Sequence, residues 1–381
     1  MVHSTLGPYV HMVDLENSKY VKQFNIKASG NGEESSDDEV SGYSWYSSMR
    51  VYSLKLSGDN KEIIAGCGRT GQGAPIQVFD INQNKLKHRI IAHKDDINSV
   101  CYVDKENSSI FISGSDDGRC KLWDTRILVN NKPVGIFHGH LAGLTCVSSK
   151  GDNRYFISNS KDQSIKLWDL RKAVTEDMKT LFMPYDYRYQ RPSKANLREI
   201  RMIQKRTNSI DQSIMTFEGH TVSGTLIRCH FSPLYGTGQR YVYSGSYDGK
   251  VYIFDTVSGD HIASLELPKD EDNSGAIVRD CAWHPFSQSL ISTSFNREIH
   301  RWEYMDLRNS EKITEEEAEW ETDEEEGPRA SQFGRLVIED ESEVSEENGD
   351  NDEDYEPEDD VPNWQRNYVL GDSSGPEEED T

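Results

Sequence analysis

An internal repeat of about 45 residues constrains the fold of this chain more than any other feature. Three copies share one pattern, in which a turn of small and acidic residues leads into an apolar, aromatic and acidic end: Phe111–Asp124, Phe156–Asp169 and Val242–Asp255. The aromatic residue near the end recurs at Phe79, Trp123, Trp168, Phe254 and Trp302, with spacings of 44, 45, 86 and 48 residues. The spacing of 86 is one period plus an insertion of about 41 residues.

Each copy has the composition of short antiparallel strands. Runs such as Val51–Leu56 alternate apolar and polar residues and are rich in β-branched and aromatic side chains. Gly-His pairs or their equivalents stand at Ala92-His93, Gly139-His140 and Gly219-His220. This period, with a Gly-His start and a Trp-Asp end, is typical of WD repeats, whose four-stranded blades pack side by side. We therefore predict an all-β fold, a WD40 β-propeller, over residues 1–304.

The number of blades falls short of the seven that are usual for WD repeats. Five can be assigned, at residues 20–81, 86–126, 134–171, 213–256 and 261–304. Pro8–Leu15 reads as the last strands of a further blade, so that about five and a half blades are visible. We expect that an N-terminal portion of a longer protein is missing, and an unclosed ring would expose strand edges.

The resemblance to WD repeats implies a hydrogen-bonded set within each blade. The two sets are His93, Ser113 and Asp117 with Trp123, and His140, Ser158 and Asp162 with Trp168. Serine, histidine and aspartate also form hydrolase triads, but a trio that recurs once per blade favours a structural role.

No other pattern predicts catalysis. The chain has no glycine-rich phosphate loop, no metal-ligand spacing and no nucleophile elbow, and Cys281 and His284 lack further ligands nearby in sequence. We expect neither an enzyme nor a cofactor.

The acidic balance of the chain is concentrated at its C-terminal end. Residues 306–381 hold 30 acidic and 5 basic side chains, whereas residues 1–305 hold 36 and 37. We therefore predict a disordered acidic tail over residues 305–381, in which Phe333–Ile338 and Trp364 are candidate docking segments. A nearly neutral propeller argues against direct nucleic-acid binding.

The chain also has no predicted membrane segment. No apolar run approaches the ~18 residues that cross a bilayer, and no signal peptide follows Met1. The six cysteines contain no C-x-x-C pair and lie mostly in strand-like runs, which favours buried free thiols in a reducing, intracellular compartment.

Two insertions interrupt the repeats. The first, residues 27–48, is acidic and is either a flexible linker or a kinase site at Ser35 or Ser36. The second, residues 172–212, is basic and rich in tyrosine, and we single out Tyr187, Arg188, Tyr189 and Arg191. Arginine and tyrosine are enriched at protein interfaces, so we expect partner binding. A single-strand nucleic-acid surface and a solvated loop stay open as alternatives.

Two consecutive repeats end in the pattern W-D-x-R, at Trp123–Arg126 and Trp168–Arg171. Each closes a box of sixteen residues, Phe111–Arg126 and Phe156–Arg171. The box resembles the motif by which WD-repeat proteins dock on the large subunit of the damage-specific DNA-binding protein, the adaptor of cullin-4 ligases. The resemblance implies this adaptor-docking set: Trp123, Asp124, Arg126, Trp168, Asp169 and Arg171. The planar fork of arginine suits such docking, although both arginines could instead pair with acids on neighbouring loops.

Three further runs narrow the resemblance. Ser158–Asp169, Thr225–Pro233 and Val278–Pro285 resemble the subfamily called cullin-4-associated factor eleven, or WD-repeat-containing protein twenty-three, and the likeness covers about residues 1–304. It implies a substrate receptor of a cullin-4 RING ubiquitin ligase. Such a receptor bridges the adaptor, and through it cullin-4 and the RING subunit, to an unidentified protein destined for proteasomal degradation, in the nucleus and cytoplasm. The alternative is a general WD40 scaffold, nuclear and associated with histones or RNA, without a ligase role.

Overall fold

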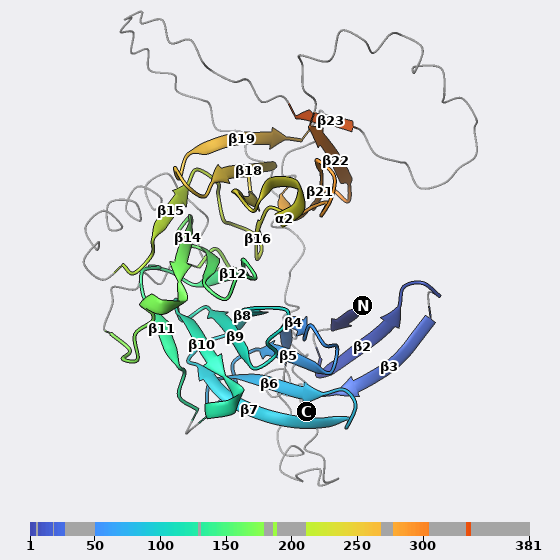
Figure 1. Ribbon diagram of the computed structural model, residues 1–381, viewed down its shortest axis with the longest axis vertical. Helices are drawn as coiled ribbons and strands as arrows, with labels where there is room; N and C mark the ends of the chain where they lie inside the picture. Colours follow the sequence, from blue (N-terminus) through green and yellow to red (C-terminus); the bar gives the residue numbers. More distant parts are fainter. Residues whose placement is uncertain are drawn as a thin grey trace, which may run out of the picture. The chain divides into compact units, whose positions relative to one another are not determined.

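The computed structural model describes residues 1–4, 7–17, 19–26, 50–128, 131–178, 186–188, 211–267, 277–304 and 333–336. Within these ranges the regular secondary structure is almost all β-strand, and the strands form six sheets (Figure 1). The acidic insertion at 27–48, together with Tyr189 and Arg191, lies outside the described residues.

Each sheet is built from strands that follow one another along the chain. The first sheet has three strands: β1 (Val2–Ser4), β2 (Tyr9–Asp14) and β3 (Lys19–Asn25). The second consists of β4 (Val51–Leu56), β5 (Glu62–Cys67), β6 (Ala74–Asp80) and β7 (Lys85–His93). The third consists of β8 (Ile97–Tyr102), β9 (Ile110–Ser115), β10 (Cys120–Asp124) and β11 (Gly135–Phe137).

The three later sheets repeat this arrangement. The fourth consists of β12 (Leu144–Ser149), β13 (Tyr155–Ser160), β14 (Ser164–Asp169) and β15 (Met215–Glu218). The fifth consists of β16 (Cys229–Phe231), β17 (Tyr241–Gly245), β18 (Lys250–Asp255) and β19 (His261–Glu266). The sixth consists of β20 (Val278–Trp283), β21 (Ser289–Ser294), β22 (Ile299–Tyr304) and β23 (Phe333–Leu336). The short helices are η2 (Thr125–Ile127), η3 (Leu170–Lys172) and α2 (Leu234–Thr237).

The predicted blade borders are wrong by one strand. We ended each blade at the Trp-Asp pair, but the strand after that pair completes the same sheet: β7 pairs with β6, and β11 pairs with β10. Likewise β3 pairs with β2, although we had assigned it to the next blade. His93, the last residue of β7, bonds to Ser113 and Asp117 of the third sheet and so lies where the second and third sheets meet.

The apolar core lies between consecutive sheets. One cluster joins Ile64 and Ile76 of the second sheet to Phe111 and Trp123 of the third. Another joins Leu122 to Phe156 and Trp168. Sheets whose two faces are both covered account for wholly buried strands such as β14.

Two further observations bear on the sequence predictions. All six cysteines are buried and free, as predicted. Phe333–Leu336, which we placed in a disordered tail, pairs as β23 in parallel with β22; this correction concerns those four residues alone. No helix in the described part of the chain is long and apolar enough to cross a membrane.

Candidate functional site

The structure brings the two predicted hydrogen-bonded sets together. His93 ends β7 of the second sheet and bonds to the third: its Nδ1 atom lies 2.9 Å from an oxygen of Asp117 and its Nε2 atom lies 2.7 Å from Ser113 Oγ. The indole of Trp123 donates to the same Ser113 Oγ at 2.9 Å. Because indole only donates and a carboxylate only accepts, the serine hydroxyl donates to Nε2 and Nδ1–H donates to the aspartate.

The fourth sheet repeats this chain of bonds. The contacts are His140 Nδ1 to Asp162 at 2.9 Å, His140 Nε2 to Ser158 Oγ at 2.7 Å, and Trp168 Nε1 to Ser158 Oγ at 2.7 Å. His140 precedes β12, Ser158 lies in β13 and Asp162 lies in the turn after β13. The hydrogen bonds among them therefore hold the segment that leads into β12 against the fourth sheet. Ser113 and Ser158 are wholly buried, and neither hydroxyl can reach a substrate.

Burial sets the charge state of these groups. Burial lowers the pKa of His93, and the opposing charge of Asp117 does not cancel that shift. Burial alone would raise the pKa of Asp162, but the charge and hydrogen bond of His140, with Lys166, hold it at about 2. Asp162 therefore stays ionised at neutral pH and accepts hydrogen bonds from its surroundings.

The two W-D-x-R arginines lie at the opposite ends of the strands from these aspartates. Asp124 ends β10 and caps η2 by accepting from the backbone N–H of Arg126 at 2.9 Å. The same carboxylate accepts from Arg126 Nε at 2.9 Å and from its Nη2 at 2.7 Å. Asp169 holds Arg171 in the same way, through its Nε at 3.0 Å and its Nη2 at 2.5 Å.

This pairing leaves each guanidinium fixed and accessible. The side chains of Arg126 and Arg171 are 61% and 67% exposed. Two of the five N–H groups of each guanidinium face the aspartate, and three remain for a partner. The hydrogen bonds from Arg171 hold the pKa of Asp169 far below its ordinary value, and those from Arg126 lower that of Asp124. The acids that hold the arginines belong to the motif itself, rather than to neighbouring loops.

Two members of the predicted docking set cannot touch a partner. Trp123 and Trp168 are 0% and 1% exposed because they fill the core between sheets and bond to the buried serines. Their place in the docking set stays a prediction, and in the structure they hold the strand that ends in Asp124 or Asp169.

A further exposed arginine that pairs with a strand-end aspartate, outside the W-D-x-R motif, was missed by sequence reasoning. Arg240 lies 63% exposed, and its Nε atom donates to Asp255, the last residue of β18, at 2.7 Å. Asp255 is the equivalent of Asp124 and Asp169, but Arg240 precedes β17 rather than following the aspartate. Arg154 stands at the same place before β13 and bonds to Asp169 at 3.2 Å. In both repeats the arginine precedes the strand-end aspartate by the same number of residues, and this spacing was the signal in the sequence that could have identified Arg240.

The fifth sheet departs from the hydrogen-bonded pattern. Phe254 replaces the tryptophan, and His220 turns its Nε2 atom to the Asn159 side-chain oxygen at 2.9 Å instead of to a serine of β17. Its Nδ1 atom is buried with no hydrogen-bond partner among the described residues. Burial lowers the pKa of His220 to about 4.

We expect His220 to make the protein less stable in mild acid. The unfolded chain binds a proton at His220 near pH 6.5, whereas the folded chain binds it only near pH 4. The free energy of unfolding should therefore fall as pH drops from about 6.5 to 4, by up to about 3 kcal/mol. Urea titrations across this range measure it. In His220→Gln the decline should be shallower by about one proton; equal slopes in the wild type and the variant would contradict the assignment.

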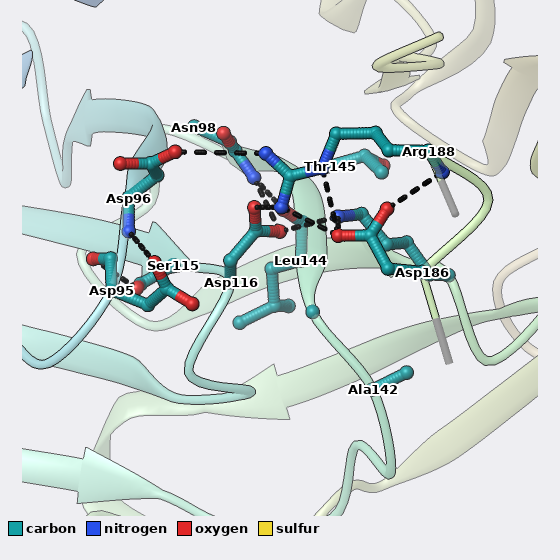
Figure 2. A network of polar contacts seen from close by, with 12 residues as sticks. Asp95, Asp96, Asn98, Ser115, Asp116, Ala142, Leu144, Thr145, Asp186 and Arg188 are labelled. Carbon is teal, nitrogen blue, oxygen red and sulfur yellow. Dashed lines mark hydrogen bonds and ion pairs between the residues drawn. The ribbon is translucent and has the colours of Figure 1, made fainter. Parts of the chain in front are cut away.

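The described part of the basic insertion packs against the chain itself. Figure 2 shows Asp186 and Arg188 meeting the turns that follow β9 and β13. Arg188 Nη2 lies 2.8 Å from Asp116, and Lys161 Nζ lies 2.8 Å from Asp116 and 3.0 Å from Asp186. The ring of Tyr187 covers Lys161 Nζ at 5.0 Å. Partner binding through Tyr187 and Arg188 stays a prediction, and the contacts that the structure gives them are intramolecular.

Among the described residues, no group of three histidine, cysteine or acidic side chains could hold a metal ion. In the two serine, histidine and aspartate sets, both serines and both histidines are buried.

Comparison with known proteins places the repeats in a family. The model of the WD domain, G-beta repeat, matches residues 84–124, 131–169 and 211–255. The chain contains WD40 repeats. A solved structure titled "Crystal Structure of Mitotic Checkpoint Complex" contains a chain with the same fold, at a TM-score of 0.53 and 15% identity over 79% of this chain and 72% of that one. The predicted fold class, an all-β WD40 β-propeller, is confirmed.

Two curated relatives are closer in sequence to this WD40-repeat protein. The LEC14B protein of Lithospermum erythrorhizon is 41% identical over 80% of this chain. The DDB1- and CUL4-associated factor 11 homolog of Caenorhabditis elegans is 34% identical over 66% of this chain. The chain spans 60% of the first relative and 42% of the second. The predicted likeness to cullin-4-associated factor eleven is thereby confirmed.

Proposed function

We propose that this WD40-repeat protein is the substrate-recognition and adaptor-docking subunit of a cullin-4 RING ubiquitin ligase. It would bind the large subunit of the damage-specific DNA-binding protein, and through it cullin-4 and the RING subunit, in the nucleus and cytoplasm. A protein bound elsewhere on the chain would then be ubiquitinated and degraded. In this role the chain would contribute binding surfaces, and the catalytic step would belong to the other subunits.

The observation that carries the proposal is the pair of exposed arginines on adjacent sheets, each clamped by the aspartate of its own motif. A clamped guanidinium loses little side-chain freedom when a partner binds, so more of its hydrogen-bond energy contributes to affinity. Its remaining donors suit carboxylate or carbonyl oxygens. The printed name of the Caenorhabditis relatives, which refers to DDB1 and CUL4, supports the same partner.

The test is capture of the purified adaptor by the full chain. We expect Arg126→Ala/Arg171→Ala to weaken binding by at least about 100-fold, because two interface arginines at about 2 kcal/mol each exceed that factor. Arg240→Ala is the matched control: it removes an equally exposed, aspartate-bound arginine that lies outside W-D-x-R.

Circular dichroism verifies that all three proteins remain folded. Adaptor capture that is equal in the wild type and the double variant would reject docking through W-D-x-R. No capture by the folded wild type would reject the ligase role and leave the general scaffold alternative.

A further inference from the structure

The second surface of interest lies at the strand ends opposite the W-D-x-R arginines. Asp116 begins the turn between β9 and β10, and Lys161 begins the turn between β13 and β14. Tyr155 pairs with Asp169 at one end of the fourth sheet, so the turn at Lys161 lies at the other end. A ligand at these turns would leave the arginine surface free.

The sheets themselves build the fixed part of this surface. Asn98 donates to Asp116 at 2.8 Å and to the Leu144 carbonyl at 2.7 Å, which joins the third and fourth sheets. Asp96 accepts from the backbone N–H of Arg69 at 2.6 Å. Asp116 and Lys161 have side chains only 4% and 2% exposed, so their ion pair is held away from solvent.

Residues 186–188 occupy this surface as a peptide ligand would. The carboxylate of Asp186 reaches Lys161, and the guanidinium of Arg188 reaches Asp116 at 2.8 Å and Asp96 at 3.6 Å (Figure 2). Between them, the Tyr187 ring covers the ammonium group of Lys161. The segment thus carries an acidic, an aromatic and a basic residue in that order, and these contact one basic and two acidic residues of the sheets.

Charge complementarity makes this recognition selective. Burial would raise the pKa of Asp186, but hydrogen bonds from Arg188 and Lys161 hold it at about 2. The segment therefore brings one negative and one positive charge to sites of opposite sign. A segment with the two charges exchanged would place like charges together.

We propose that Asp96, Asp116 and Lys161 form a peptide-binding site for partner proteins that carry an acidic residue, an aromatic residue and an arginine in that order. Asp186–Arg188 occupies the site in cis and is displaced by a partner segment of the same chemistry. In a ligase, this site would be the place where the substrate binds. That part of the inference rests on the proposed function.

The tether makes the internal segment a strong competitor. A linked segment acts at an effective concentration of about 1 mM. A free peptide with a dissociation constant of about 10 µM would then bind the intact chain about 100-fold more weakly than a chain whose own segment is disabled.

The experiment measures binding of a fluorescent peptide with the sequence of residues 181–193 to the full-length chain by anisotropy, without adaptor. The opened variant Asp186→Ala/Arg188→Ala should bind the peptide about 100-fold more tightly than the wild type. A peptide with alanine at the same two positions should not bind, and adding Asp116→Asn to the opened variant should abolish binding.

A folded opened variant that binds neither peptide, or both equally, overturns the proposal. If that variant does not fold, the wild-type chain is used instead. The native peptide should half-saturate it near 1 mM, whereas the alanine peptide should not. Equal binding of the two peptides to the wild-type chain overturns the proposal. Adaptor capture does not enter either measurement, so failure here is distinguishable from failure of the ligase role.

Discussion

Replacing Asp162 with alanine should lower the free energy of unfolding by about 3 to 5 kcal/mol. The Asp162 side chain is wholly buried and accepts from His140 Nδ1, from the Leu141 backbone N–H and from the Ser164 hydroxyl. Its loss leaves these three buried donors, and the Ser164 backbone N–H as a fourth, without their acceptor, and the His140–Ser158–Trp168 chain loses the group that orients the imidazole. Equilibrium unfolding in urea, followed by tryptophan fluorescence, measures the change.

Asp248→Ala is the matched control for this change. Asp248 occupies the same place in the turn between β17 and β18, but it is exposed and accepts from the Tyr252 hydroxyl at 2.7 Å. We expect it to cost no more than about 1 kcal/mol. Equal losses at the two positions would show that the turn, rather than the buried chain of bonds, stabilises the sheet.

The fold and the hydrogen-bonded sets were predictable because they are periodic. A residue that recurs at one offset, as Ser113 and Ser158 do before Trp123 and Trp168, must meet the same environment in each sheet. The position of Arg126 and Arg171 shortly after the Trp-Asp pair also places both arginines beyond the end of the strand. The sequence did not reveal that each of these arginines pairs with the aspartate two residues before it, because either strand-end carboxylate could equally have faced a loop.

The features that escaped prediction depend on contacts between distant residues. Local propensity cannot tell which sheet receives the strand after a Trp-Asp pair, since β7 has the same composition whichever neighbour it joins. Arg240 was missed because its aspartate lies on the following hairpin. Contact of Arg188 with Asp116 spans 72 residues and depends on the path of the insertion, which no repeat specifies.

The two ends of the strands in the third and fourth sheets therefore carry different kinds of surface. One end carries a repeated motif, with the same arginine–aspartate pair in each sheet. The other end carries the single cluster around Lys161, to which the two sheets and the insertion contribute. Repeated surfaces suit a partner common to many WD40 proteins, whereas a surface completed by an insertion suits a partner specific to this one.

Lys161→Met should lower the free energy of unfolding by about 3 to 5 kcal/mol, because it leaves the buried Asp116 carboxylate without one of the two cations that lie 2.8 Å from it. Lys150→Met is the control, since its pair with Asp152 spans 3.9 Å and is partly exposed; it should cost less than about 1 kcal/mol. Adding Asp116→Asn removes the buried charge that has lost the Lys161 partner, while an amide oxygen can still accept from Asn98, so the double variant should recover much of the loss.

The pH dependence of Lys161→Met separates a charge effect from a packing effect. Burial already raises the pKa of Asp116, against the opposing charges of Lys161 and Arg188. Without Lys161 it should rise further, so that the folded chain takes up a proton at a higher pH than the unfolded chain does. Stability lost at neutral pH should then be regained as pH falls toward that raised pKa. A deficit relative to the wild type that stays constant with pH would mean that Lys161 stabilises the sheets by filling space, and the ion pair would no longer account for the cluster.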